Sequence, residues 1–100
     1  MDINSLLKLV DTTRDSAMLR LTLARLLTAE GDLEQAAAHL QAAVDMDGQY
    51  TAAWKELGKV RLQQENPDEA ARAWRKGIDS ARARGDKQAE KEMNVFLKRL

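Results

Sequence analysis

The sequence predicts an all-α fold of about six helices, arranged as helix–turn–helix repeats. The first supporting observation is internal similarity: a shift of 34 residues places Leu57 on Leu23. The same shift places Trp74 on Leu40, and small or polar residues elsewhere also match in kind. The second supporting observation is that apolar residues recur at helical spacing between short turns rich in Gly, Asp and Asn. A fixed period of this length is typical of repeat proteins.

We expect one domain over residues 1–100, because a chain of 100 residues builds a single, modest core. The period divides this domain into four parts. They are a leading helix with its loop (1–15), a first repeat (17–50), a second repeat (51–84) and a C-terminal capping helix (86–100).

The leading helix is predicted from apolar residues at positions i, i+3, i+4 and i+7, namely Ile3, Leu6, Leu7 and Val10. Asp15 or Ser16 can cap the next helix, which we expect to end near Ala29. Gly31 then suits a helix end and Asp32 a helix start, so the second helix of the first repeat should span 33–46.

The second repeat should begin with a helix over 51–64. The clearest helix start in the sequence follows, with Asn66 as the cap and Pro67 in the first helical position. This helix should end near Ala83. The last helix, 86–100, has one apolar stripe that should close the open end of the stack: Ala89, Met93, Phe96, Leu97 and Leu100.

Composition argues against several function classes. The chain has no cysteine, one histidine and no Gly-rich phosphate loop, so we expect no enzyme activity, no cofactor and no metal site. No stretch approaches the 18 apolar residues of a membrane span, and the basic residues are interspersed with acidic ones, so we expect neither a membrane nor a nucleic-acid partner. A cytoplasmic protein is expected.

Two short motifs carry a family resemblance. The W-x2-L-G pattern that begins at Trp54 and the A-x3-W pattern from Ala70 to Trp74 resemble the tetratricopeptide repeat. The whole chain is similar to small stand-alone bacterial proteins with two such repeats and flanking helices. The resemblance implies a right-handed stack of helix pairs with a concave face, although Arg20 stands at the usual Trp and Glu65 at the usual turn glycine.

In this family the concave face is lined by the first helix of each repeat and usually holds a peptide or helix of another protein. Carried over by repeat position, the groove residues would be Met18, Leu21, Arg25, Thr28 and Ala29 in the first repeat, and Ala52, Lys55, Lys59, Leu62 and Gln63 in the second. Of these, Arg25, Lys55 and Lys59 would orient a partner by charge. The apolar anchors would be Met18, Leu21 and Leu62.

The resemblance therefore implies a non-enzymatic module that binds another protein or peptide. Three cations on one face could hold an acidic amphipathic segment of a partner, and the alternative is that they are ordinary solvated charge. The alternative to partner binding is a structural unit that self-associates. Residues 1–50 hold four basic and eight acidic side chains, whereas residues 51–100 hold twelve basic and eight acidic ones, so oppositely charged ends could pair. We expect a monomer or a weak homodimer.

Overall fold

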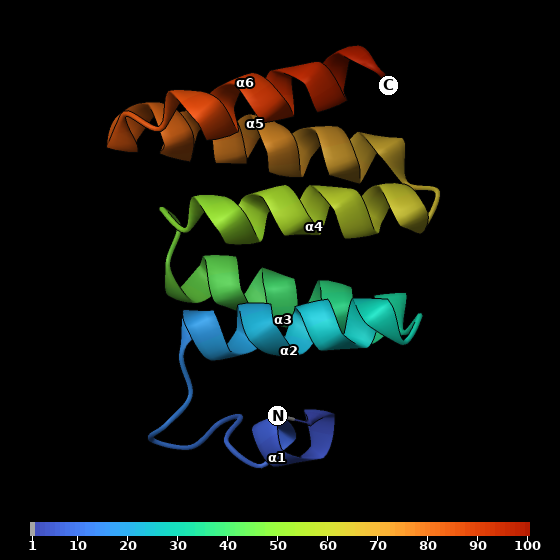
Figure 1. Cartoon of the computed structure of the whole chain (residues 1–100), viewed down its shortest axis with the longest axis vertical. Coiled ribbons are helices and arrows are strands. Elements are labelled where there is room, and N and C mark those ends of the chain that lie inside the picture. The colour runs from blue at the N-terminus through green and yellow to red at the C-terminus, as the bar shows by residue number, and fades with distance from the viewer. Residues whose placement is uncertain (1) are drawn as a thin grey trace.

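The computed structural model describes residues 2–100, which form six α-helices stacked along one axis (Figure 1). The helices are α1 (Ile3–Leu7), α2 (Ala17–Ala29), α3 (Leu33–Met46), α4 (Thr51–Gln63), α5 (Pro67–Arg84) and α6 (Lys87–Lys98). Each helix packs against the next, and α1 and α6 lie at opposite ends of the stack. The prediction of an all-α fold with six helices is confirmed.

The helix starts follow the predicted capping residues. Ser16 caps α2, where its hydroxyl oxygen accepts a hydrogen bond from the Leu19 N–H (3.0 Å). The carboxylate of Asp32 and the side-chain carbonyl of Asn66 cap α3 and α5 in the same way. Each cap satisfies one of the amides that a helix start leaves without an internal partner. These local signals explain why the sequence located the starts of α2, α3 and α5 so closely, whereas α4 begins after Tyr50 without a side-chain cap.

The leading helix is shorter than its apolar spacing suggests. It ends at Leu7, and the chain then passes through Asp11, whose φ of 63° is left-handed. The backbone N–H of Asp11 donates to Asp15 Oδ2 at 2.8 Å. Val10 still packs on the core from this loop, so its apolar character reflects burial and not helical structure.

Two buried clusters form the core. The larger one joins α1 to α4 and contains Leu23, Ala36 and Leu40, all at most 1% exposed. The smaller one joins α5 to α6 around Trp74 and Met93. Because its residues come from both helices, α6 covers the apolar end of the second repeat, as expected of a terminal helix in a repeat stack.

Two glycines mark the closest approaches between helices. A Cβ at Gly58 would collide with the indole of Trp74, and one at Gly77 would lie 2.5 Å from Met93 Sδ and 3.0 Å from Trp54 Cβ. Gly77, which stands where the family pattern has alanine, thus makes room for the side chain by which α6 docks.

Glu65 takes the turn-glycine conformation without being glycine. Its φ is 61°, against 82° for Gly31 in the corresponding turn of the first repeat. A non-glycine residue pays for this region in steric strain, of the order of 1–2 kcal/mol. The positive φ at this turn is therefore imposed by the geometry of the repeat and is not a preference of the Glu65 residue itself.

Candidate functional site

Three surface hollows lie around α6, on the side where it meets α4. The Leu62 hollow has a volume of about 320 Å³ and is lined by Lys59, Leu62, Gln63, Trp74, Phe96, Arg99 and Leu100. The Val95 hollow (about 300 Å³) is lined by Gln88, Lys91, Glu92, Val95, Phe96 and Arg99. The Ala52 hollow (about 150 Å³) is lined by Thr51, Ala52, Lys55, Asp86, Gln88, Ala89 and Glu92.

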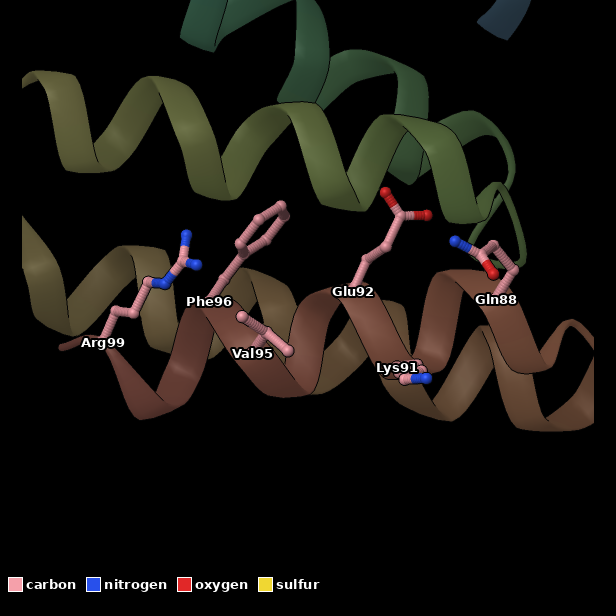
Figure 2. Close-up of a pocket in the computed structure, with 6 residues that line it drawn as sticks. All are labelled: Gln88, Lys91, Glu92, Val95, Phe96 and Arg99. Atoms are coloured by element: carbon pink, nitrogen blue, oxygen red, sulfur yellow. The ribbon is translucent and has the colours of Figure 1, made fainter.

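The side chains that separate these hollows come from α6. In Figure 2, Glu92 and Phe96 point from α6 toward α4. Phe96 and Arg99 line both the Leu62 hollow and the Val95 hollow, so these two hollows are neighbours on either side of one ring. Glu92 lines both the Val95 hollow and the Ala52 hollow. The three hollows therefore form one continuous surface along α6.

The groove residues predicted for the second repeat all lie at this surface. Lys59, Leu62 and Gln63 line the Leu62 hollow, whereas Ala52 and Lys55 line the Ala52 hollow. Leu62 is 43% exposed, which is high for a large apolar side chain.

Two of the predicted cations already interact with α6. Lys55 Nζ lies 3.5 Å from Glu92 Oε2, so Lys55 is an ion-pair partner and not a free cation. Lys59 Nζ lies 5.7 Å from the centroid of the Phe96 ring, within the range of a cation–π contact, and 3.9 Å from Glu56 Oε1. The Lys55–Glu92 pair and the Lys59–Phe96 contact connect α4 with α6, whereas the Lys59–Glu56 contact lies within α4. The Lys59 side chain remains 44% exposed.

The groove residues predicted for the first repeat differ in how exposed their side chains are. Met18 is 69% exposed and Arg25 is exposed, so both can reach a partner from α2. Thr28 is half-buried, and its hydroxyl donates to the Ala24 carbonyl at 2.8 Å. None of these three side chains lines the hollows around α6.

The prediction that Leu21 anchors a partner is wrong. Leu21 is 3% exposed and belongs to the same buried cluster as Leu6 of α1. Because α1 packs directly against α2, the leading helix occupies surface beside the first repeat, and Leu21 serves the core.

Sequence reasoning missed the contribution of α6 to this surface. The interpretation of α6 as a cap placed Leu100 inward, but Leu100 is 48% exposed. A signal was present in the helix starts: α4 begins 34 residues after α2, and α6 begins 36 residues after α4. Shifting Ala52, Lys55, Lys59 and Gln63 by 36 gives Gln88, Lys91, Val95 and Arg99, all of which line the Val95 hollow. By its position α6 is thus the first helix of an unpaired third repeat.

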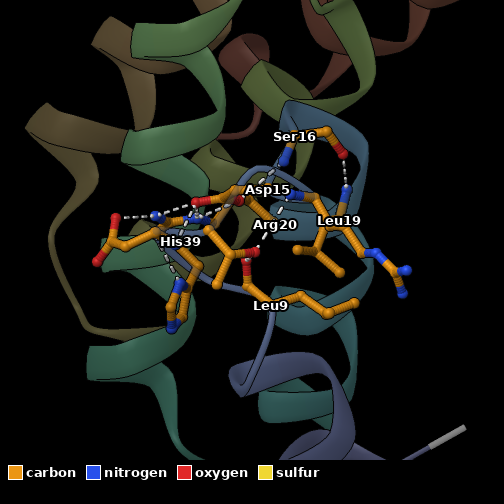
Figure 3. Close-up of polar contacts among 9 residues, drawn as sticks. Leu9, Asp15, Ser16, Leu19, Arg20 and His39 are labelled. Carbon is orange, nitrogen blue, oxygen red and sulfur yellow. Dashed lines mark hydrogen bonds and ion pairs between the residues drawn. The ribbon is translucent and has the colours of Figure 1, made fainter.

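A second polar cluster fixes the loop before α2. Figure 3 shows the Arg20 guanidinium between Asp15 and His39. Nη2 of Arg20 lies 2.8 Å from Asp15 Oδ2 and 3.2 Å from Asp11 Oδ1, and Nη1 lies 3.2 Å from His39 Nδ1. The side chains of Arg20 and Asp15 are only 11% and 8% exposed. This cluster stands where the family pattern has a tryptophan, and it ties the leading segment to α2 and α3.

Charge and burial set the protonation states in this cluster. The hydrogen bonds from Arg20, together with the N–H of Asp11, lower the pKa of Asp15 to about 2. Burial, helped by the positive charge of Arg20, lowers the pKa of His39 below its ordinary 6.5. Since a guanidinium only donates, His39 Nδ1 must accept, which requires a neutral imidazole. The cluster is built from satisfied ion pairs and holds the fold together.

Residues 2–100 also bear on membrane and metal binding. In that part of the chain, no helix has the length and apolar character needed to cross a membrane. The same residues contain no group of three or more His, Cys, Asp or Glu side chains placed to hold a metal ion.

Known proteins resemble this chain in sequence and fold. The tetratricopeptide repeat profile matches residues 27–86. A TPR repeat-containing protein of Pseudomonas aeruginosa is 45% identical over all of this chain and 95% of its own length. The solution structure of a Bordetella parapertussis protein superposes with a TM-score of 0.82 at 36% identity, over 99% of this chain and 86% of that one. The Sgt2 TPR domain of Aspergillus fumigatus gives 0.81 at 26% identity, over 97% and 64%.

Proposed function

Because this chain belongs to the tetratricopeptide repeat family, whose fold generally mediates protein–protein interaction, we propose that it is a non-enzymatic adaptor in the cytoplasm. It binds a peptide or helix of a partner protein on the surface formed by α2, α4 and α6. We call this surface the first-helix face. It comprises Met18 and Arg25 of α2, Lys59 and Leu62 of α4, and the α6 residues that line the three hollows.

The observation that supports this proposal best is the combination of hollows and charge along α6. The Leu62 and Val95 hollows have apolar walls, and three cations stand at their edges: Lys59, Lys91 and Arg99. Glu92 is the one Asp or Glu side chain that lines either hollow, and it is paired with Lys55. Such a surface attracts an acidic segment and repels a basic one.

Self-association is the second candidate, and a specific observation favours it. Large apolar side chains are exposed near both ends of the stack, with Leu7 at 37% and Leu100 at 48%. The acidic N-terminal half could meet the basic C-terminal half of another copy. Sedimentation velocity over a range of concentrations, at low and high salt, distinguishes the two candidates. A monomer throughout removes self-association, whereas a dimer that dissociates in salt supports it.

Affinity capture from a lysate of the source organism tests the adaptor function. The native chain is compared with the Arg25→Glu, Lys59→Glu, Arg99→Glu variant, which reverses three exposed cations of the first-helix face without touching the Lys55–Glu92 pair. The matched control is Arg75→Glu, Lys76→Glu, Arg84→Glu, which makes the same charge change at exposed positions of α5. Circular dichroism confirms that all three proteins are folded.

We expect a protein that the native chain and the control retain and the first-helix-face variant loses. A protein that all three retain equally would contradict binding at this face.

A further inference from the structure

We infer that the Leu62 hollow is the subsite that receives one bulky apolar side chain from an acidic amphipathic segment of the partner. Lys59 and Arg99 contact the carboxylates that flank this side chain. The inference rests on the proposed function, because it names the partner chemistry at one place on the first-helix face.

The size of the hollow fits a whole side chain. Its volume of about 320 Å³ is roughly twice that of a protein cavity of about 150 Å³ that takes up benzene. Two of its walls are exposed apolar side chains, Leu62 at 43% and Leu100 at 48%. Covering them would remove apolar surface from water, which is the main favourable term in binding of this kind.

The floor of the hollow is aromatic and has no unsatisfied polar group. Trp74 is 2% exposed, and its Nε1 already donates to the Lys55 carbonyl at 3.1 Å. Its ring lies 5.2 Å from the ring of Phe96, at an angle of 45°. A phenylalanine, leucine or methionine side chain therefore meets only carbon surface there, and a polar side chain would lose hydrogen bonds to water without replacing them.

The rim selects the charge of the segment. Lys59 and Arg99 are the charged side chains that line the hollow, and no Asp or Glu side chain lines it. Lys59 interacts with Glu56 only at 3.9 Å, between partly exposed side chains, which is a weak ion pair. A carboxylate from the partner can compete for this lysine. A segment with lysine or arginine beside its apolar residue would place like charges together.

The neighbouring hollow extends the recognised segment. The Val95 hollow shares Phe96 and Arg99 with the Leu62 hollow and adds Lys91 as a further cation. Side chains at positions i and i+4 of a helix lie about 6 Å apart on one face. An amphipathic helix with acidic residues between its apolar ones can thus fill both hollows.

The experiment uses three synthetic, acetylated 14-residue peptides with the full-length protein. The first carries Phe and Leu four residues apart among glutamates. In the second, lysines replace all glutamates, and in the third, serine replaces the phenylalanine. Binding is followed by tryptophan fluorescence, because Trp74 lies in the hollow, and is located by amide chemical shifts of the ¹⁵N-labelled protein.

We expect the acidic peptide to bind and to shift the amides around Leu62, Phe96 and Arg99. Leu62→Gln and Arg99→Glu should each weaken binding by on the order of tenfold, since each removes a contact of the size of one buried apolar group or one charge pair. Met46→Gln and Arg84→Glu are the matched controls on α3 and α5, and should leave the affinity within about twofold, since both residues are exposed and neither lines the hollows around α6. The serine and lysine peptides should bind far more weakly.

Equal binding of the lysine peptide, or an unchanged affinity in Leu62→Gln, would overturn the inference. So would amide shifts confined to α3 and α5, or sedimentation showing that a second copy of the chain covers the hollow. These failures are distinct from failure of the adaptor function. A captured protein that depends on the first-helix face, combined with no peptide binding at the hollow, would leave the adaptor function in place and remove this subsite.

Discussion

Lys55 in α4 and Glu92 in α6 form an ion pair with 3.5 Å between Nζ and Oε2, although 37 residues separate them in the chain. The pair has two consequences. It helps to hold α6 against the second repeat, and it neutralises one of the three cations that the sequence assigned to partner binding. The contacts that α6 makes with α4 therefore help to determine how many unpaired cations the first-helix face carries.

Glu92→Gln should raise the affinity for an acidic peptide. The substitution releases Lys55 and adds one positive charge to the first-helix face, so association should become faster and more sensitive to salt. Because both partners are partly exposed, the free energy of unfolding should fall by no more than about 0.5–1 kcal/mol. Titration with the acidic peptide at two salt concentrations measures the effect.

The control for this prediction is Glu90→Gln, which removes the same charge from α6. Glu90 pairs with Arg82 at 2.8 Å and does not line the Leu62, Val95 or Ala52 hollow. An equal gain in affinity in both variants would mean that overall charge, and not the release of Lys55, is responsible.

Met93→Ala should destabilise the protein by about 2–4 kcal/mol, because it opens a cavity where a fully buried side chain packs on Gly77. Val95→Ala on the same helix should cost less than about 1 kcal/mol, since Val95 is 38% exposed. Urea unfolding of the two variants provides the comparison. Similar losses would show that α6 does not dock through Met93.

Gly58→Ala should cost about 1–3 kcal/mol, because its Cβ would force Trp74 out of its buried position. Gly48→Ala is the matched control, since the nearest atom to its Cβ would be the Val44 carbonyl oxygen at 3.9 Å. For a domain of this size, the melting temperature should fall by roughly 4–8 °C for each kcal/mol lost. If the two variants have the same melting temperature, the close contact between α4 and α5 does not require glycine at position 58.

The Arg20 cluster should make stability fall in acid. The pKa of Asp15 is about 2 in the folded chain and near 3.8 when unfolded, so the unfolded chain takes up this proton first. The stabilisation is then complete above about pH 5 and is lost as the pH falls toward 2. The pKa of His39 is also lowered, so stability should begin to decline as the pH falls below 6.5.

Denaturation midpoints between pH 7.5 and 3 check this behaviour. Asp15→Asn should flatten the acid part of the curve, and His39→Gln the decline that begins as the pH falls below about 6.5. A His39→Gln curve parallel to that of the native chain would show that His39 is equally easy to protonate in both states.

The sequence predicted the parts of this structure that depend on local signals. Ser16, Asp32 and Asn66 are capping residues, and a period of 34 residues locates the repeats. The family resemblance implied that Lys59 and Leu62 line a surface groove, and in the structure both line a hollow.

What the sequence did not predict depends on contacts between distant segments. Leu21 has the spacing of a groove residue, but α1 packs beside it and it is buried. That Val95 and Arg99 line a surface hollow was hidden because α6 starts two residues later than the repeat period requires. Arg20 stands at an aromatic position, and only the folded loop brings Asp11 and Asp15 to its guanidinium.

We propose above that partners bind the first-helix face along α4 and α6. The most direct test of this proposal is amide chemical-shift mapping of the ¹⁵N-labelled protein with the captured partner, or with the segment of it that binds. We expect perturbations concentrated around Lys59, Leu62, Phe96 and Arg99, and their loss in the Arg25→Glu, Lys59→Glu, Arg99→Glu variant. Perturbations confined to α3 and the exposed side of α5, unchanged in that variant, would contradict the proposal.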